Sequence, residues 1–521
     1  MDMPNLTRRG FGTLLLGGSS YLLLDGCGRS IERAPVDGAA VGGIAPSIDG
    51  LPRSSPEAQG VPSQAILDFI SDVAGANLEL HSFMLMRGGH VIAEGWWWPY
   101  QPQRVHMTHS LTKSVTATGV GLAIDEGRFG LDDRVVSFFP EHVPADATAH
   151  MRAMTVRDLL TMQAGHDRAT SGSLWRPIKT SWITEFFKIP VPHAPGTQFK
   201  YTSAASFMLS AIVSRTTGQK LSDYLTPRFL EPMGIRKLSW DVGPGDISTG
   251  GNGLSWTTDA SLKLGAVHAA NGRWKGQQIL SERWVRAATT RQSGDAEDDY
   301  GYHWWMGPGR SYYALGLFTQ LSIVFPEHDA TLAIFSAIDG SSKLKPHIWK
   351  HFPGAFGPTA LPASRAATEL SRRSAELRLL QPLAGRRSPT ERSAGRRFRM
   401  SANDQSVAWV EFDFAGDTCS YRMADARGEH RIAAGFNDYV EQTTSMTGAR
   451  LHHEYEPDRA LVVAGAEWTA PDTLKLIWQF AESAFRDTLV CQFAGDSVRI
   501  DRSVNLNSSE TRLPTLTGEA T

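Results

Sequence analysis

A serine and a lysine that could act together in catalysis stand three residues apart in segment 108–115, Thr-His-Ser-Leu-Thr-Lys-Ser-Val. Side chains at that spacing lie on one face of a helix, so the Lys113 amine can reach the Ser110 hydroxyl. A serine hydroxyl is a poor nucleophile until a base takes its proton, and a lysine can be that base when burial keeps its amine neutral. Ser110 and Lys113 are therefore a candidate nucleophile and base.

The spacing alone is not specific, because Ser342 and Lys345 repeat it in a polar stretch. The sequence after Ser110 differs from that stretch. Residues 115–124 are largely apolar and end at a polar break, which predicts a buried helix. A lysine at the start of a buried helix indicates a function for its amine.

The length and composition are those of an ordinary globular protein. A chain of 521 residues is long enough for two domains with extensions, and a net charge of -2 with 20% charged residues gives no reason to expect nucleic acid as a partner. Cys27, Cys419 and Cys491 are too few for a disulfide framework, although the last two could either pair or remain buried thiols. We expect no metal and no cofactor.

The first 28 residues are expected to be a targeting segment. Thr-Arg-Arg-Gly-Phe-Gly at 7–12, followed by a short apolar stretch, resembles a twin-arginine export signal, and the stretch is too short to span a bilayer. Leu-Asp-Gly-Cys at 24–27 resembles a lipobox, although Asp25 departs from the usual pattern. We expect export to the periplasm, membrane attachment if Cys27 is lipidated, and a flexible linker over 29–50; an uncleaved leader is the alternative.

Strand signals at both ends of a helical block organise residues 51–355. They predict an α/β (α+β) domain with one mixed sheet, a helical lobe and a cleft where the two meet. The predicted helices are 63–74, 156–162, 204–217, 221–229 and 259–271, besides the serine helix. The predicted strands are 80–87, 91–97, 300–306, 312–317, 320–325 and 331–337.

Six segments in this order resemble landmarks of serine hydrolases with the class C β-lactamase fold. That group includes D-alanyl-D-alanine carboxypeptidases, esterases and amide hydrolases. Landmarks in a fixed order are far more specific than one motif. The segments are Ser-Leu-Thr-Lys at 110–113, 154–161, Pro-Gly-Thr-Gln-Phe-Lys-Tyr-Thr-Ser at 195–203, 250–254, 300–305 and 314–320.

The resemblance implies a role for Tyr201, whose phenol would relay a proton between Ser110 and Lys113. Two residues further on, many relatives carry an asparagine that binds the substrate carbonyl or the lysine. Here that position is Ser203, whose shorter side chain donates one hydrogen bond. A β-lactam-like amide would be held less well.

The strand beside the cleft departs most from the family. Relatives carry Lys-Thr-Gly or His-x-Gly there, and this chain has the substrate-facing residues Leu317, Phe318 and Thr319 instead, with no cation. The backbone amides of Ser110 and Gln320 are expected to form the oxyanion hole, which needs only amide hydrogens. The missing cation favours esters or neutral amides over penicillins and peptidyl-D-alanine.

A second domain is expected after a linker with a helix at 356–400. Short strands from 407 to 502 predict a small β-sandwich or partly closed barrel over 401–510. The arginine-rich stretch 365–399 is interpreted as a helix that runs into a solvated linker, with an anionic-surface contact as the alternative. The tryptophans at 96–98 are expected to cover the sheet, with a substrate groove as the alternative.

These features favour a serine hydrolase that acts on an ester or amide, with a β-lactam as one candidate, through an acyl-enzyme. The first alternative is a β-lactamase or D,D-carboxypeptidase acting on cell-wall peptides, and the second is a non-catalytic envelope receptor for a cell-wall fragment. The absence of Gly-x-Ser-x-Gly and His-Glu-x-x-His argues against an α/β-hydrolase and a zinc protease. His106, His109 and His166 are expected near the cleft without the spacing of metal ligands.

Overall fold

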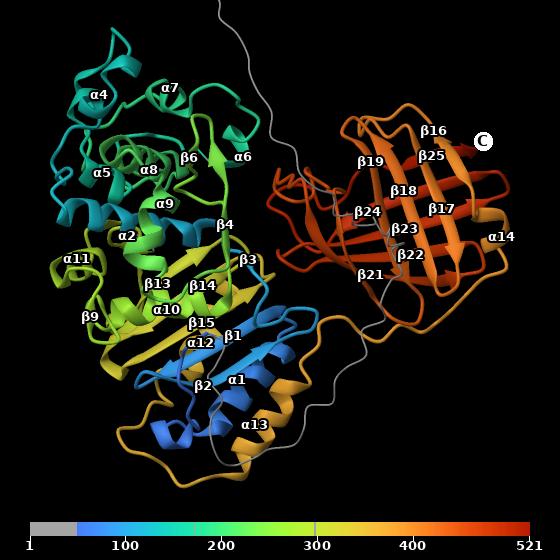
Figure 1. Ribbon diagram of the computed structural model, residues 1–521, viewed down its shortest axis with the longest axis horizontal. Helices are drawn as coiled ribbons and strands as arrows, with labels where there is room; N and C mark the ends of the chain where they lie inside the picture. The colour runs from blue at the N-terminus through green and yellow to red at the C-terminus, as the bar shows by residue number, and fades with distance from the viewer. Residues whose placement is uncertain (1–48, 171, 296–297) are drawn as a thin grey trace, which may run out of the picture. The chain divides into compact units, whose positions relative to one another are not determined.

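The computed structural model describes residues 49–170, 172–295 and 298–521 (Figure 1). The predicted leader, Cys27 and residues 29–48 of the predicted linker lie outside these described residues. Within these ranges, the search for a helix long and apolar enough to cross a membrane finds none.

The central sheet of the first domain has the strand order β10-β11-β12-β13-β14-β15-β1-β2. The sequence predicts a mixed sheet, but the pairings between its described strands are all antiparallel, including that of the first strand, β1, with β15. The long strands are β1 (Leu80–Arg87), β2 (His90–Trp96), β13 (Tyr312–Gly316), β14 (Gln320–Phe325) and β15 (Ala330–Ser336). The short strands are β10 (Ser293–Gly294), β11 (Asp299–Tyr300) and β12 (Trp305–Met306).

The turns of this sheet follow from residues that tolerate left-handed backbone. Gly88 and Gly89 have φ of 56° and 74° in the β1–β2 hairpin, as the sequence predicts. The predicted strand 300–306 is instead a hairpin of β11 and β12, in which Tyr300 pairs with Trp305. His303 turns the chain between them with φ of 60°, so one continuous strand cannot form.

Helices cover both faces of the sheet (Figure 1). α1 (Ser63–Gly75) packs with α12 (Lys345–His351) and α13 (Arg365–Ala375), while α10 (Thr258–Ala269) packs against β1, β14 and β15. In the tryptophan run expected to cover the sheet, the Trp97 ring packs on Phe83 of β1 at a centroid distance of 6.1 Å. The Trp98 amide donates to the Leu377 carbonyl at 3.0 Å, just beyond α13.

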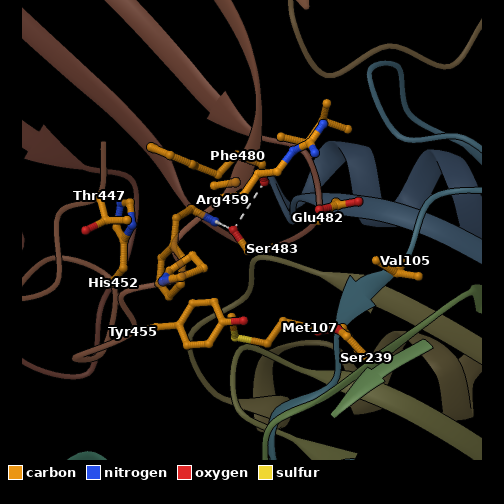
Figure 2. A pocket seen from close by; sticks show the side chains of 15 residues that line it. Val105, Met107, Ser239, Thr447, His452, Tyr455, Arg459, Phe480, Glu482 and Ser483 are labelled. Carbon is orange, nitrogen blue, oxygen red and sulfur yellow. Dashed lines mark hydrogen bonds between the residues drawn. The ribbon is translucent and has the colours of Figure 1, made fainter. Parts of the chain in front are cut away.

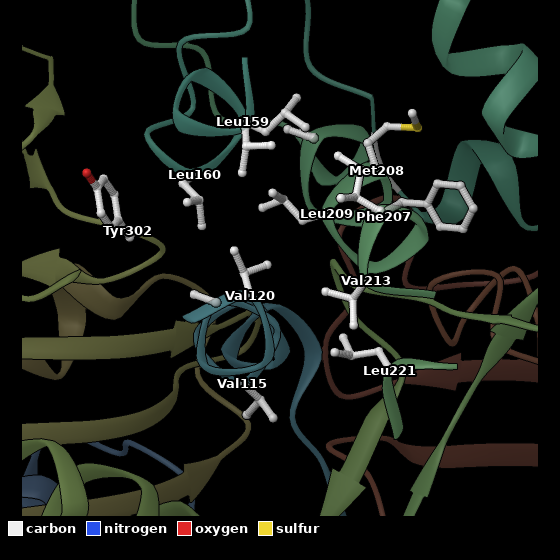
Figure 3. Packing of buried hydrophobic residues seen from close by; sticks show 14 of the residues in the cluster. Val115, Val120, Leu159, Leu160, Phe207, Met208, Leu209, Val213, Leu221 and Tyr302 are labelled. Carbon is white, nitrogen blue, oxygen red and sulfur yellow. The ribbon is translucent and has the colours of Figure 1, made fainter. Parts of the chain in front are cut away.

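The helical lobe is built around α2 (Thr112–Asp125), the predicted serine helix, which packs against α8 (Ser203–Thr217) and α9 (Leu221–Leu225). Figure 3 shows Val115 and Val120 of α2 within this core. Gly119 allows the close approach, because a Cβ there would lie 2.4 Å from a Leu221 methyl group. The predicted helix 221–229 ends early in a π-helical turn (Thr226–Leu230), since Pro227 offers no amide hydrogen.

The short elements of the lobe frame this core. They include α5 (Val156–Leu160) at the predicted position 156–162, and a small sheet in the order β3-β7-β4. The other helices are α3 (Val135–Phe138), α4 (Ala149–Ala153), α6 (Gly172–Trp175), α7 (Trp182–Phe187) and α11 (Glu282–Ala288). The small sheet consists of β3 (His106–Met107), β7 (Leu254–Trp256) and β4 (Leu238–Trp240).

The C-terminal domain is a closed barrel with the order β19-β18-β17-β16-β25-β24-β23-β22-β21-β20, closed by a pairing of β19 with β21. The strands predicted between 407 and 502 are present as β17 (Trp409–Ala415), β18 (Thr418–Asp425), β19 (Gly428–Gly435), β21 (Ala460–Ala470), β22 (Thr473–Phe480), β23 (Arg486–Ala494) and β24 (Ser497–Val504). Cys419 and Cys491 are buried free thiols inside it.

Three barrel strands were not anticipated. β16 (Arg397–Met400) lies in the segment expected as a linker, and β25 (Leu516–Ala520) lies beyond residue 510, yet the two pair with each other. β20 (Val440–Thr444) is largely polar. All three are short. β16 alternates as Arg-Phe-Arg-Met but spans only four residues, while β20 and β25 carry mostly polar residues or glycine, so none gives a strong strand signal.

Direct hydrogen bonds join the barrel to the first domain. The Met107 amide donates to the Glu482 carbonyl at 2.8 Å, and the Tyr100 phenol donates to the Ser483 carbonyl at 2.7 Å. An ion pair between Arg486 and Glu79 adds a third link at 2.7 Å. The barrel therefore packs against the strand that leads into the Ser110 turn.

Candidate active site

Ser110 lies in a short 3-10 turn (His109–Leu111) between β3 and α2. His109 has φ of 48°, so the chain bends sharply immediately before the serine. The Thr108 amide donates to the Leu254 carbonyl at 2.9 Å, which ties the turn to β7. Ser110 is half-buried and faces a cavity, as a nucleophile that must meet a substrate requires.

Lys113 is 1% exposed and directs its amine at three oxygens. Its Nζ lies 3.2 Å from Ser110 Oγ, 3.0 Å from Ser203 Oγ and 2.7 Å from the Gly251 carbonyl. Among the described residues no carboxylate forms an ion pair with it. Burial lowers the pKa of Lys113 to about 7, so a large fraction of the amine is neutral near neutral pH and can accept a proton.

Tyr201 lies just before α8, with its ring centroid 4.8 Å from the Lys113 amine. Trp305 stacks on the tyrosine ring at a centroid distance of 5.4 Å and fixes its plane. Burial raises the pKa of Tyr201 above its ordinary value, while a hydrogen bond with Ser110 opposes that rise. The phenol therefore stays protonated and can donate a proton beside the serine.

Ser203 is the first residue of α8 and lines the same cavity. Its hydroxyl accepts a hydrogen bond from Lys113, so in the described structure it contacts the lysine. A Cβ on Gly251 would lie 2.8 Å from the Ser203 Cβ, and this close packing holds the two segments together.

The predicted substrate-binding residues 317–319 form the turn between β13 and β14, and they point in different directions. Leu317 lines the cavity beside Ser110. Phe318 and Thr319 are buried and adopt left-handed φ of 60° and 66°. The Thr319 hydroxyl donates to the Ile338 carbonyl at 2.9 Å, while Phe318 packs in the barrel core. Only Leu317 of the three can meet a substrate in this arrangement.

The expected oxyanion role of the Gln320 backbone amide stays a prediction, while its side chain has a structural role. Gln320 is fully buried on β14, an inner strand, and is absent from the lining of the cavity. Its side-chain amide donates to the carbonyls of Phe318 at 3.1 Å and Ser336 at 2.8 Å, so it fixes the turn. Within residues 316–320, Leu317 is the residue that lines the cavity.

Gly316 brings the strand end against the nucleophile turn. A Cβ at this position would lie 2.0 Å from the Thr108 carbonyl oxygen, so a residue with a side chain does not fit. The glycine thereby allows β13 to pass directly beside the Ser110 turn.

The cavity at Ser110 has a volume of about 190 Å³ and includes residues that sequence reasoning missed. Arg176 and Asp241 reach it from the helical lobe, while His453 and Tyr455 come from the barrel. No motif signals these residues, because they are brought together only by the tertiary fold. The rest of the lining comprises Met107, His109, Ala169, Thr170, Gly172, Tyr201, Thr202, Ser203, Asn252, Gly253, Ser255 and Leu317.

A second cavity of about 110 Å³ lies where the barrel meets β3 (Figure 2). Met107, Ser255 and Tyr455 line both cavities, so they form the wall between them. Figure 2 shows the Tyr455 phenol pointing toward Met107 in this wall. The barrel therefore helps to shape the space around Ser110.

The three histidines expected near the cleft have different surroundings. His109 lines the cavity, His106 hydrogen-bonds His81 at 2.9 Å, and His166 packs on Phe186 at a centroid distance of 5.3 Å. Burial lowers the pKa of each. Across the described ranges, no group of three or more His, Cys, Asp or Glu side chains could hold a metal ion.

The second serine and lysine pair is not arranged like the first. Ser342 is exposed, and the Lys345 amine donates to the Tyr313 phenol at 3.0 Å. Although burial opposes it, this hydrogen bond raises the pKa of Lys345, so the amine stays charged and cannot act as a base at neutral pH. Burial without a charged partner distinguishes Lys113.

The antiparallel sheet with its helical lobe, and a serine beside a buried lysine at their junction, define the class of serine hydrolases with the β-lactamase fold. The chain belongs to the Beta-lactamase family, whose family model matches residues 74–351, more than half of its length.

Two curated proteins and one solved structure illustrate the similarity. The 6-aminohexanoate-dimer hydrolase of Paenarthrobacter ureafaciens is 26% identical over 241 residues, covering 42% of this chain and 60% of that protein. An uncharacterized protein of Mycobacterium tuberculosis (strain CDC 1551 / Oshkosh) is 25% identical over 265 residues, covering 40% of this chain and 66% of that protein. The chain thus spans less than two thirds of either relative. A putative 6-aminohexanoate-dimer hydrolase from Bacillus anthracis shares the fold, with a TM-score of 0.50, 16% identity, and coverage of 60% and 89% of the two chains.

Proposed function

We propose that this protein hydrolyses a small ester or amide through an acyl-enzyme formed on Ser110. The observation that carries the proposal is the Lys113 amine, which lies 3.2 Å from the serine oxygen and has a pKa lowered to about 7 by burial. A neutral amine at that distance can take the hydroxyl proton as the oxygen attacks.

The first half-reaction forms a bond between Ser110 Oγ and the substrate carbonyl carbon. Lys113 accepts the serine proton, and Tyr201 passes a proton to the leaving alcohol or amine as its bond to the carbonyl carbon breaks. In the second half-reaction water attacks the acyl-enzyme, gives up a proton to the same pair, and releases the acid and the serine. The reaction needs no group beyond the chain and water.

The oxyanion hole is assigned to the backbone amides of Ser110 and Leu317. The contact of Gly316 with the Thr108 carbonyl places the strand end against the serine turn, and Leu317 follows Gly316. Leu317 is preferred to Gln320 here because Leu317 lines the cavity and Gln320 does not. Removing one such donor typically lowers kcat by about 100- to 1000-fold.

The similarity to a 6-aminohexanoate-dimer hydrolase supports a small amide as one substrate class. Export by a twin-arginine-type leader and lipidation of Cys27 remain proposals on the leader sequence alone. Labelling with radioactive palmitate, compared between the full chain and Cys27→Ala, tests the second of these.

A screen of chromogenic substrates tests the proposed activity. We expect steady turnover of a short-chain ester or anilide, loss of it in Ser110→Ala, and little turnover of a chromogenic cephalosporin. Preferred hydrolysis of the cephalosporin or a peptidyl-D-alanine would favour the β-lactamase or D,D-carboxypeptidase alternative. If Ser110 is not labelled by a fluorophosphonate and no substrate is turned over, the non-catalytic receptor is favoured.

A further inference from the structure

Arg176 brings a positive charge to the cavity that the strand beside Ser110 lacks. It follows α6 directly and lines the same cavity as Ser110 and Leu317. The side chain is half-buried, which costs free energy for a charged group unless something compensates it. The residues around Arg176 must therefore offset part of this cost.

Two residues of the barrel hold Arg176 in place. Its Nη1 donates to the His453 carbonyl at 2.8 Å, and its guanidinium carbon lies 5.4 Å from the centroid of the Tyr455 ring. Both contacts orient the planar group and neither carries a negative charge. In the part of the chain that the structure describes, its other guanidinium nitrogens have no hydrogen-bond partner and no carboxylate forms an ion pair with it.

Asp241 supplies a more distant counter-charge. It lines the same cavity, and burial raises the pKa of its carboxyl to about 6 although Arg176 lowers it. Its attraction offsets part of the cost of burying Arg176 without an ion pair that would occupy the guanidinium donors. A guanidinium with free paired donors is suited to bind a carboxylate through two hydrogen bonds.

We propose that Arg176 binds a carboxylate of the substrate, so that the preferred substrates are esters or amides that carry a free carboxylate apart from the scissile bond. This inference rests on the proposed function and names its substrate class. It also revises the expectation of neutral substrates. The strand beside Ser110 carries no cation, but Arg176 of the helical lobe supplies one to the same cavity.

A matched pair of esters tests this proposal. The two substrates are the p-nitrophenyl monoester of glutaric acid, which carries a carboxylate, and p-nitrophenyl pentanoate, which is neutral and of similar length. We expect the wild type to show a lower KM for the anionic ester. Arg176→Gln should lower kcat/KM for that ester by about 10- to 100-fold, mainly through KM, and change the neutral ester less than about 2-fold.

Two further variants separate recognition from folding. Arg176→Lys keeps the charge but loses the paired donors, so we expect an intermediate KM. Arg283→Gln removes an arginine whose side chain is 81% exposed on α11, and we expect both esters to be unaffected. An equal loss for both esters in Arg176→Gln, or no preference of the wild type for the anionic ester, would overturn the proposal.

A binding measurement keeps this test independent of turnover. Calorimetric titration of glutarate into Ser110→Ala, with and without Arg176→Gln, reports the anion site even if the protein proves inactive. We expect the second substitution to weaken glutarate binding by about 10-fold or more. Equal binding by both variants refutes the anion site, whereas absent labelling and turnover of the wild type refutes only the proposed hydrolysis.

Discussion

Phe318 and Phe485 lie edge to face with ring centroids 5.7 Å apart, and this contact ties the turn beside the nucleophile to the core of the C-terminal barrel. Phe318 adopts this position with φ of 60°, a left-handed conformation that is uncommon for a residue with a side chain. Its packing therefore compensates a local conformational cost. The barrel is thus a structural support of the candidate active site.

Phe318→Ala is expected to lower both stability and activity. Removing a buried phenylalanine typically costs about 3 kcal/mol or more of unfolding free energy, and here it also frees the turn that carries Leu317. Thermal unfolding and ester kinetics measure the two effects. Phe356→Ala is the matched control, since Phe356 is also buried but packs on Phe352, away from the cavity. An unchanged kcat in Phe318→Ala would show that the barrel does not support the site.

The pH profile of kcat/KM is expected to report Lys113. Its pKa of about 7 means that the amine becomes protonated below that pH and loses its capacity as a base. Activity should therefore fall about tenfold per pH unit well below pH 7 and level off above it. Asp241 also lines the cavity, and its pKa is raised to about 6, so it could produce a similar limb. If Lys113 causes the fall in activity, Asp241→Asn should show the same acidic limb as the wild type. A flat profile from pH 5 to 8 would contradict the role of Lys113.

Tyr201→Phe should lower kcat by about 100-fold or more, because proton transfer by a placed side chain contributes a factor of that size. The ring remains to pack against Trp305, so the unfolding temperature should change little. Tyr312→Phe, at a buried tyrosine outside the cavity lining, is the control and should keep full activity. Equal activities of the two variants would remove Tyr201 from the mechanism.

Gly316→Ala should reduce activity by about 100-fold, because the added Cβ would clash with the Thr108 carbonyl and displace a proposed oxyanion donor. Gly354→Ala is the comparison, since no atom lies within 4 Å of the Cβ it would add. Initial rates on one ester, with circular dichroism to check folding, measure the effect. Wild-type rates for Gly316→Ala would argue against the Leu317 amide.

The sequence was sufficient for the features that depend on local spacing. The approach of Lys113 to Ser110 follows from helix geometry, and the hairpin at residues 88–89 from two glycines. Features set by tertiary contacts were not accessible in this way. Arg176 is held at the cavity by the carbonyl of His453, which belongs to the barrel and lies far along the chain. No local sequence pattern predicts this contact.

The position of Gln320 shows a similar limit. Gln320 pairs with Gly316 across a turn with two left-handed residues, yet Leu317 within that turn is the residue that lines the cavity. The barrel boundaries were missed for another reason. β16 and β25 are neighbouring strands that pair with each other and with β17 and β24, and these long-range pairings are not visible in either short segment alone.

Intact-protein mass spectrometry after treatment with a fluorophosphonate tests whether Ser110 is a nucleophile activated by Lys113. The account predicts that the wild type gains the mass of one adduct, that peptide mapping places it on Ser110, and that Ser110→Ala gains none. We also expect Lys113→Met, which removes the base, to be labelled at least about 100 times more slowly while circular dichroism shows a native fold. An adduct that persists in Ser110→Ala, or labelling of Lys113→Met at the wild-type rate, would contradict the account.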